Sequence, residues 1–166
     1  MSLYHRILVP LDGSPTAERG LREAIGLARD QHATLHLVHV MDDGPMTAER
    51  APVTGDADTL DGLRRRGDVL LARARRAAGE AGVSAQSTLR EATRDTVAQA
   101  IVEEARAARC DLIVMGTHGR RGVTRLAMGS EAEAVSRTSP VPVLLVRQDS
   151  APGALCTADE VRRDRW

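Results

Sequence analysis

Four short apolar runs divide the chain, and their pattern predicts strands that are buried on both faces. The runs are rich in Val, Ile and Leu and show little alternation with polar residues, as is typical of a parallel sheet covered by helices. They are Ile7 to Val9, Leu35 to Val40, Leu112 to Met115 and Val143 to Val146. A more polar segment, Ser84 to Arg90, is predicted to be an outer strand, so we expect five strands.

Apolar stripes with helical spacing lie between these runs. The first helix is expected to begin near residue 15, because Ser14 can cap it and Pro15 suits its first turn. Two further stripes, at 70–81 and 98–108, end shortly before the next predicted strands. Regular alternation of strand and helix predicts a doubly wound α/β fold of three layers with right-handed crossovers.

The 166 residues are enough for one domain, which we expect to span residues 1–148. The segment 42–62 is rich in Pro, Gly and acidic residues and is predicted to be a mobile insertion between the second strand and the second helix. Residues 149–166 form a polar, Arg-rich tail that is expected to be flexible.

Composition removes several classes of function. The 23 basic residues balance 23 acidic ones, so the total charge does not favour nucleic acid. Every basic residue is Arg, which excludes a Walker-type phosphate loop because that loop requires Lys. The only aromatic residues are Tyr4 and Trp166, so stacking on aromatic side chains cannot hold a base.

The cysteines and the apolar runs bear on location. Cys110 and Cys156 have neither the spacing of metal ligands nor the density of a disulfide scaffold. The apolar runs are shorter than a membrane span, and the first residues lack the charged and apolar regions of a leader. We therefore expect a cytoplasmic protein that does not enter a membrane.

A long connection follows the strand that ends at Met115. It begins at Gly116, and the next helix cannot begin much before Gly129 and Ser130, whereas such connections usually need two to six residues. Ligands of open α/β sheets bind beyond the carboxyl ends of the strands, where this loop and the turn after Pro10 both lie. Glycines let the backbone approach an anion, and a helix start attracts phosphate.

Residues of these two segments also have structural explanations. Ser130 could cap the helix in a capping box with Glu133, or its backbone could serve phosphate. Asp12 could shape the turn before the first helix, although its place at a strand end favours contact with a ligand. His118 is more easily explained as a solvated loop residue, since no other metal ligand lies at a suitable spacing. Arg120 could neutralise phosphate.

The segment GTHGRRGVTRLAMGS fits the spacing Gly-x-x-Gly, nine residues, Gly-Ser. This spacing resembles the ATP-binding signature of universal stress proteins of the UspA type. The resemblance extends to residues 7–14, 111–116 and 139–146 and covers roughly residues 5–147. It implies a Rossmann-like fold of the adenine nucleotide alpha hydrolase type, with a five-stranded parallel sheet in the order 3-2-1-4-5.

The resemblance also implies a site for ATP, with any Mg²⁺ arriving on the phosphates. It places Pro10 and Asp12 beside the nucleoside and Val40 against adenine. The residues that it assigns to the ribose and phosphates are Met115, Gly116, Gly119, Gly129 and Ser130. One departure is Glu131, which stands where the family usually has a small apolar residue and would repel phosphates if it pointed inward.

The last strand suggests a partner. Pro142 within it cannot donate a ladder hydrogen bond, which places the strand at a sheet edge. A homodimer through Val141 to Val146 would cover that edge, and universal stress proteins commonly dimerise in this way.

No group of residues points to catalysis. We therefore expect a dimeric, ATP-dependent regulator or sensor in the stress response that acts on an unidentified protein partner. The alternatives are a slow ATPase with Asp12 holding the metal, an AMP or cyclic AMP binder, and a dimerising adaptor without nucleotide.

Overall fold

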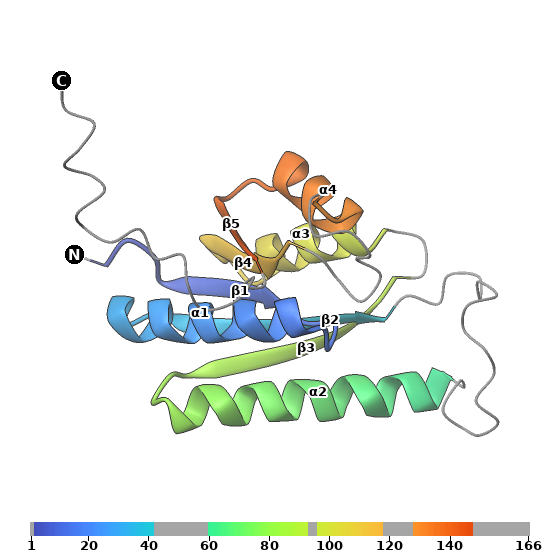
Figure 1. Cartoon of the computed structure of the whole chain (residues 1–166), viewed down its shortest axis with the longest axis horizontal. Helices are drawn as coiled ribbons and strands as arrows, with labels where there is room; N and C mark the ends of the chain where they lie inside the picture. Colours follow the sequence, from blue (N-terminus) through green and yellow to red (C-terminus); the bar gives the residue numbers. More distant parts are fainter. Residues whose placement is uncertain (1, 42–59, 93–95, 118–127, 148–166) are drawn as a thin grey trace, which may run out of the picture.

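The computed structural model describes residues 2–41, 60–92, 96–117 and 128–147. Within them, five parallel strands form one sheet in the order β3-β2-β1-β4-β5 (Figure 1). The strands are β1 (Arg6–Pro10), β2 (Thr34–Met41), β3 (Ala85–Glu91), β4 (Leu112–Gly116) and β5 (Val143–Val146). The expected five parallel strands and their order are confirmed.

Helices cover both faces of this sheet. They are α1 (Pro15–Gln31), α2 (Leu60–Glu80), α3 (Val97–Ala107) and α4 (Ser130–Thr138). Side chains of α1 and α2 share one buried hydrophobic cluster with the strands, and those of α3 and α4 share a second cluster. The predicted three-layer α/β/α architecture is therefore confirmed.

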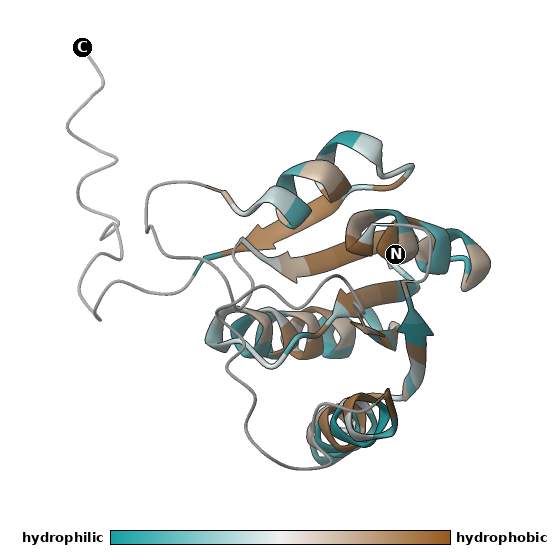
Figure 2. Ribbon diagram, turned by 90° about the vertical axis from the view of Figure 1, so that its right-hand side faces the viewer, coloured by the Kyte–Doolittle hydropathy of each residue, from teal (hydrophilic) through white to brown (hydrophobic). Residues whose placement is uncertain are grey.

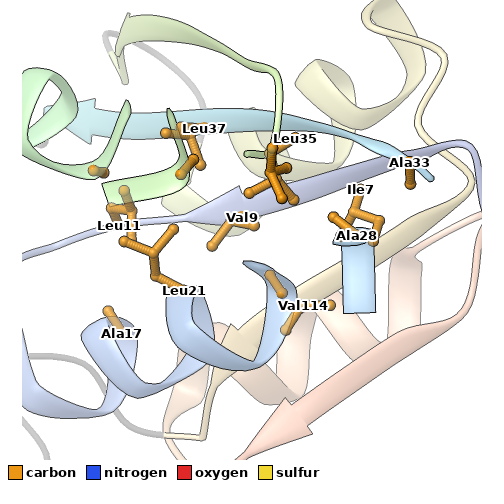
Figure 3. Close-up of a cluster of buried hydrophobic side chains, with 14 of the residues drawn as sticks. Ile7, Val9, Leu11, Ala17, Leu21, Ala28, Ala33, Leu35, Leu37 and Val114 are labelled. Carbon is orange, nitrogen blue, oxygen red and sulfur yellow. The ribbon is translucent and has the colours of Figure 1, made fainter. Parts of the chain in front are cut away.

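The two clusters explain the unbroken apolar runs of the strands. Ile7 and Val9 belong to the cluster under α1 and α2, whereas Leu8 between them belongs to the other. Figure 2 shows the hydrophobic central strands between helices whose outward faces are largely hydrophilic. Figure 3 shows how Leu21 of α1 and Leu37 of β2 converge on the β1 side chains of the first cluster. Both faces of β1 are apolar because helices bury both of them.

The start of α1 is stabilised by its own side chains, as predicted. The Ser14 hydroxyl accepts a hydrogen bond from the Ala17 N–H at 3.2 Å, and Pro15 is the first helical residue. Ser14 is buried, so this cap is shielded from water.

Helix α2 begins earlier than its apolar stripe indicates. It starts at Leu60, so the last three residues of the predicted insertion 42–62 are helical. The remainder of that insertion, like the tail, lies outside the described residues. The buried positions in the first half of α2 are Gly62 and Gly67, which carry no apolar side chain and therefore hid the stripe. A Cβ atom on Gly67 would lie 2.5 Å from Leu89 Cδ1, so a larger residue there would force side chains of the sheet to move.

Strand β5 lies at the sheet edge, as predicted, but Pro142 is not part of it. The strand begins at Val143, and Pro142 contributes its carbonyl oxygen, which accepts from the Ile113 N–H at 3.0 Å. The argument from a missing donor inside the strand was therefore wrong. The edge position follows instead from the sheet order, with β4 as the only neighbour of β5 among the described strands.

Candidate functional site

Several predicted site residues in the described ranges, among them Pro10, Asp12 and Gly116, lie at or just beyond the carboxyl ends of β1 and β4, which are adjacent in the sheet. The chain moves outward from β1 through β2 to β3 and then returns to β4, so the strand order reverses between β1 and β4. Ligands of doubly wound sheets bind in the crevice at such a reversal. Pro10 and Gly116 are the last residues of these two strands, and both are half-buried.

Asp12 shapes the turn that leads from β1 into α1. Its Oδ1 accepts from the Ser14 N–H at 2.9 Å, and the Ser14 hydroxyl then lies 3.1 Å from that of Thr16. The turn-shaping role that the sequence left open is therefore present in the structure. Contact of the Asp12 carboxylate with a ligand stays a prediction.

Gly116 is required by packing against α1. A Cβ atom at this position would lie 2.8 Å from the carbonyl carbon of Thr16 and 2.9 Å from its Cβ. Gly116 does not belong to the glycines with positive φ, so a sharp turn is not the reason for glycine here. Packing thus gives a steric reason for glycine here, because the first turn of α1 presses on the end of β4. The approach of an anion to Gly116 stays a prediction.

Two backbone hydrogen bonds anchor the ends of the connection between β4 and α4. The Thr117 N–H donates to the Val146 carbonyl at 2.9 Å, and the Gly129 N–H donates to the Thr117 carbonyl at 2.8 Å. Thr117 is buried with 5% exposure and was not singled out by the sequence reasoning, although it follows a buried strand directly. The predicted residues His118, Gly119 and Arg120 lie outside the described residues.

The start of α4 differs from the prediction. Gly129 is the N-cap residue, and no side chain of the described residues caps the helix there. Ser130 is the first helical residue, so the capping box with Glu133 is wrong, because a residue already inside the helix cannot act as its cap. The Glu133 carboxylate instead lies 3.6 Å from the Arg137 guanidinium.

This start of α4 is exposed, and no side chain in the described ranges caps it. The first N–H groups of any helix have no partner within the helix, and they carry a partial positive charge. Ser130 and Glu131 are exposed, and Gly129 is half-buried. The arrangement can bind an anion, with Glu131 as a competing negative charge in the first turn.

The apolar residues predicted to line the site lie on the α3 and α4 side of the sheet. Met115 is buried in the second cluster, and Val40 is half-buried and packs against it. Val40 is the seventh of the eight residues of β2, so it lies near the carboxyl end of its strand, as Pro10 does in β1. These side chains could contact a flat apolar group such as a base.

Two observations on the described residues concern metal ions and nucleophiles. None of them form a group of three or more His, Cys, Asp or Glu side chains that could hold a metal ion. Cys110 is buried two residues before β4, beyond the end of that strand opposite to Gly116, and burial raises the pKa of its thiol to about 12. A thiol that stays protonated at neutral pH is a poor nucleophile.

One buried polar cluster was not predicted. His36 Nε2 lies 2.7 Å from Glu104 Oε1 and 3.2 Å from Thr88 Oγ1. Arg90 Nη1 lies 3.4 Å from the second carboxylate oxygen of Glu104. This cluster joins β2 and β3 to α3 and is a packing feature. The sequence carried no signal for it because His36 and Glu104 are 68 positions apart.

Several known proteins are similar to this chain. One relative is a universal stress protein of Methanocaldococcus jannaschii, which is 32% identical over 148 residues, or 89% of this chain and 84% of the relative. A solved structure of a universal stress protein family member from Burkholderia pseudomallei is 35% identical, with a TM-score of 0.68 and coverage of 87% of this chain and 97% of that one.

Two other solved structures share the fold and contain nucleotides. A universal stress protein in complex with cAMP is 23% identical, with a TM-score of 0.64 over 87% of this chain and 97% of that one. The universal stress protein of Archaeoglobus fulgidus in complex with dAMP is 22% identical, with a TM-score of 0.63 over 88% of this chain and 99% of that one.

No helix in the described part of the chain is both long enough and apolar enough to cross a membrane. The model of the universal stress protein family matches residues 3–147, which include every described strand and helix. The chain belongs to the universal stress protein family.

Proposed function

We propose that this chain binds an adenine nucleotide, ATP, at the carboxyl edge of β1 and β4. The observation that carries the proposal is the start of α4, which lacks a side-chain cap among the described residues and is held against the end of β4 by the bond between Gly129 and Thr117. An exposed helix start at the point where strand order reverses suits the phosphates.

Each predicted residue has a role in this proposal. Pro10 and Asp12 lie beside the nucleoside, and Val40 and Met115 contact the base and ribose. The phosphates bind at Gly116, Gly129 and Ser130 together with three residues outside the described ranges: His118, Gly119 and Arg120. The cAMP and dAMP complexes of structures with this fold support an adenine nucleotide as the ligand. Mg²⁺ would arrive with ATP.

The number of phosphates depends on Glu131. Its carboxylate lies in the first turn of α4, where it opposes negative charge on a ligand. ATP is favoured because the carboxylate is exposed and therefore screened by water and salt. AMP and cyclic AMP, which carry less charge, are the alternative ligands.

The role that follows is regulation in the cytoplasm. Nucleotide binding changes the state of a homodimer formed through Val141 to Val146, and a protein partner recognises that state. The position of β5 at the edge of the sheet supports the dimer, since an exposed edge pairs readily with a second copy. Hydrolysis of ATP by pure protein within hours, lost in Asp12→Ala, would favour the slow ATPase instead.

Ser130→Glu provides the sharpest test of phosphate binding. A carboxylate at the first position of α4 favours the helix dipole but repels phosphates, so it should weaken ATP binding by roughly tenfold or more without lowering stability. Ser136→Glu is the matched control, because it adds the same charge later in the same helix. Calorimetry with ATP, AMP and cyclic AMP gives the affinities.

Two results would reject the proposal. One is an equal loss of affinity in both variants. The other is wild-type protein that neither releases adenine nucleotide on acid extraction nor binds any of the three in calorimetry, which would favour a dimerising adaptor.

A further inference from the structure

His39 connects β2 to the backbone that precedes Asp12. Its Nδ1 atom lies 2.6 Å from the carbonyl oxygen of Leu11. A carbonyl oxygen can only accept, so Nδ1 carries the proton and donates it in this bond. His39 is half-buried, and neither the sequence pattern nor the proposed function gave it a role.

Leu11 is held firmly although it lies one residue beyond β1. Its N–H donates to the Val38 carbonyl at 2.8 Å, while its own carbonyl accepts from His39. The Leu11 side chain is buried at 4% exposure in the first hydrophobic cluster. Figure 3 shows it at the edge of that cluster, close to Leu21 and Ala17 of α1. Strand β2 therefore holds Leu11 in two ways, through the His39 side chain and through the Val38 backbone. Because Asp12 follows Leu11 directly, these contacts also set the position of Asp12.

The His39 ring also packs against α2 at Gly67. A Cβ atom on Gly67 would lie 2.8 Å from the ring carbon Cδ2 of His39. Gly67 is buried, so the helix backbone comes within van der Waals distance of the ring. A side chain at position 67 would press on the ring as well as on Leu89 Cδ1, and a shift of the ring would disturb the donor to Leu11.

We propose that His39 is a positioning residue that fixes Leu11 and the Asp12 turn in the geometry that binds the nucleoside. It acts through the Leu11 carbonyl and does not touch the nucleotide. Helix α2, which packs on the ring at Gly67, is thereby coupled to the site. The inference rests on the proposed nucleotide function for its effect on affinity, while its effect on the turn is independent of any ligand.

Three variants of His39 separate hydrogen bonding from packing. His39→Asn keeps an N–H donor at the position of Nδ1 but removes most of the ring. His39→Gln moves the donor one bond further out, and His39→Leu keeps apolar volume without a donor. We expect roughly five- to tenfold weaker nucleotide binding in the Leu and Gln variants and near wild-type binding in the Asn variant.

Stability should not follow affinity across this series. His39→Asn loses ring contacts with α2 and should unfold at lower denaturant concentration than His39→Leu, although it binds more tightly. A role in packing alone would order affinity and stability in the same way, and that result would overturn the proposal.

Gly67→Ala and Gly79→Ala test the coupling to α2. Both add one methyl group to the same helix, but a Cβ atom at Gly79 meets nothing within 4 Å. Gly67→Ala should weaken nucleotide binding several-fold, and Gly79→Ala should leave it unchanged. Equal affinities in the two variants would contradict a connection through the ring.

Amide exchange without nucleotide gives the ligand-independent readout. The Ser14 N–H is bonded to Asp12 and reports the order of the turn. It should exchange faster in His39→Leu and at the wild-type rate in His39→Asn. If the wild type binds no nucleotide, the proposed function fails and this exchange comparison still decides the role of His39; identical exchange in all variants would reject that role.

Discussion

The helices α1 and α4 both begin near the edge of the sheet where β1 and β4 end, yet their starts are built differently. The start of α1 is completed by the protein itself: Ser14 caps it, Asp12 accepts from Ser14, and both Ser14 and Thr16 are buried. The start of α4 has a glycine as N-cap and an exposed Ser130. Among the described residues, a side chain caps the start of α1, and none caps the start of α4.

The largest effect is expected where the start of α1 packs on the end of β4. Gly116→Ala places a methyl group against the Thr16 backbone and should lower the free energy of unfolding by about 1–3 kcal/mol, as other overpacked sites do. Gly26→Ala on α1, where a Cβ meets nothing within 4 Å, should leave that energy unchanged or raise it slightly. Denaturant unfolding measures both. Equal stability of the two variants would show that the close contact is relieved in solution. Gly116 is therefore a poor position at which to test ligand binding.

Asp12→Asn should distinguish the role of Asp12 in the turn from its contact with the ligand. The amide oxygen still accepts from the Ser14 N–H, so the stability should change by less than about 0.5 kcal/mol. Loss of the charged acceptor should weaken nucleotide binding about tenfold, measured by calorimetry. Asp12→Ala should lose both properties. Unchanged affinity in Asp12→Asn would mean that Asp12 only shapes the turn.

The two serines offer a direct comparison of the caps. Ser14→Ala should reduce the free energy of unfolding by about 1 kcal/mol, since it removes a buried N-cap. Ser130→Ala should change it by less than about 0.5 kcal/mol, because Ser130 lies inside the helix and is exposed. Thermal or denaturant unfolding is sufficient. A similar loss in both variants would restore the capping box at the start of α4.

The smallest effect concerns the charge at the open helix start. Glu131→Gln should raise affinity for ATP roughly two- to threefold and affinity for AMP less, with the gain shrinking as salt is added. Glu133→Gln is the control, since that carboxylate faces Arg137 one turn later. Titrations at two ionic strengths decide the matter. A salt-independent gain, or none, would place Glu131 away from the phosphates.

Much of the fold could be predicted because its signals are local. The apolar runs marked four of the five strands, and Ser14 with Pro15 marked the start of α1, since strand burial and helix capping depend on neighbouring residues. The order of the strands came from the resemblance to the family. Local signals alone do not decide which strands lie side by side.

Features that depend on close contact across the fold could not be predicted. Gly67 interrupts the apolar stripe of α2. The space that a side chain would need there is occupied by His39 and Leu89, which are distant in sequence. The pairing of His36 with Glu104 has the same origin. At the site, the cap at α4 was assigned to Ser130 because its spacing to Glu133 fits a capping box, but Gly129 has the extended backbone of an N-cap and Ser130 is already helical.

The bond between Gly129 and Thr117 also has a consequence for how this site can change. It fixes both ends of the segment between them through backbone atoms, so the anchoring does not depend on the side chains in between. The entropy of closing a loop grows only with the logarithm of its length, and doubling the number of residues would cost only about 0.6 kcal/mol. Insertions and substitutions between the two anchors should therefore alter ligand preference with little loss of stability, which makes this segment the natural place to redesign what the domain binds.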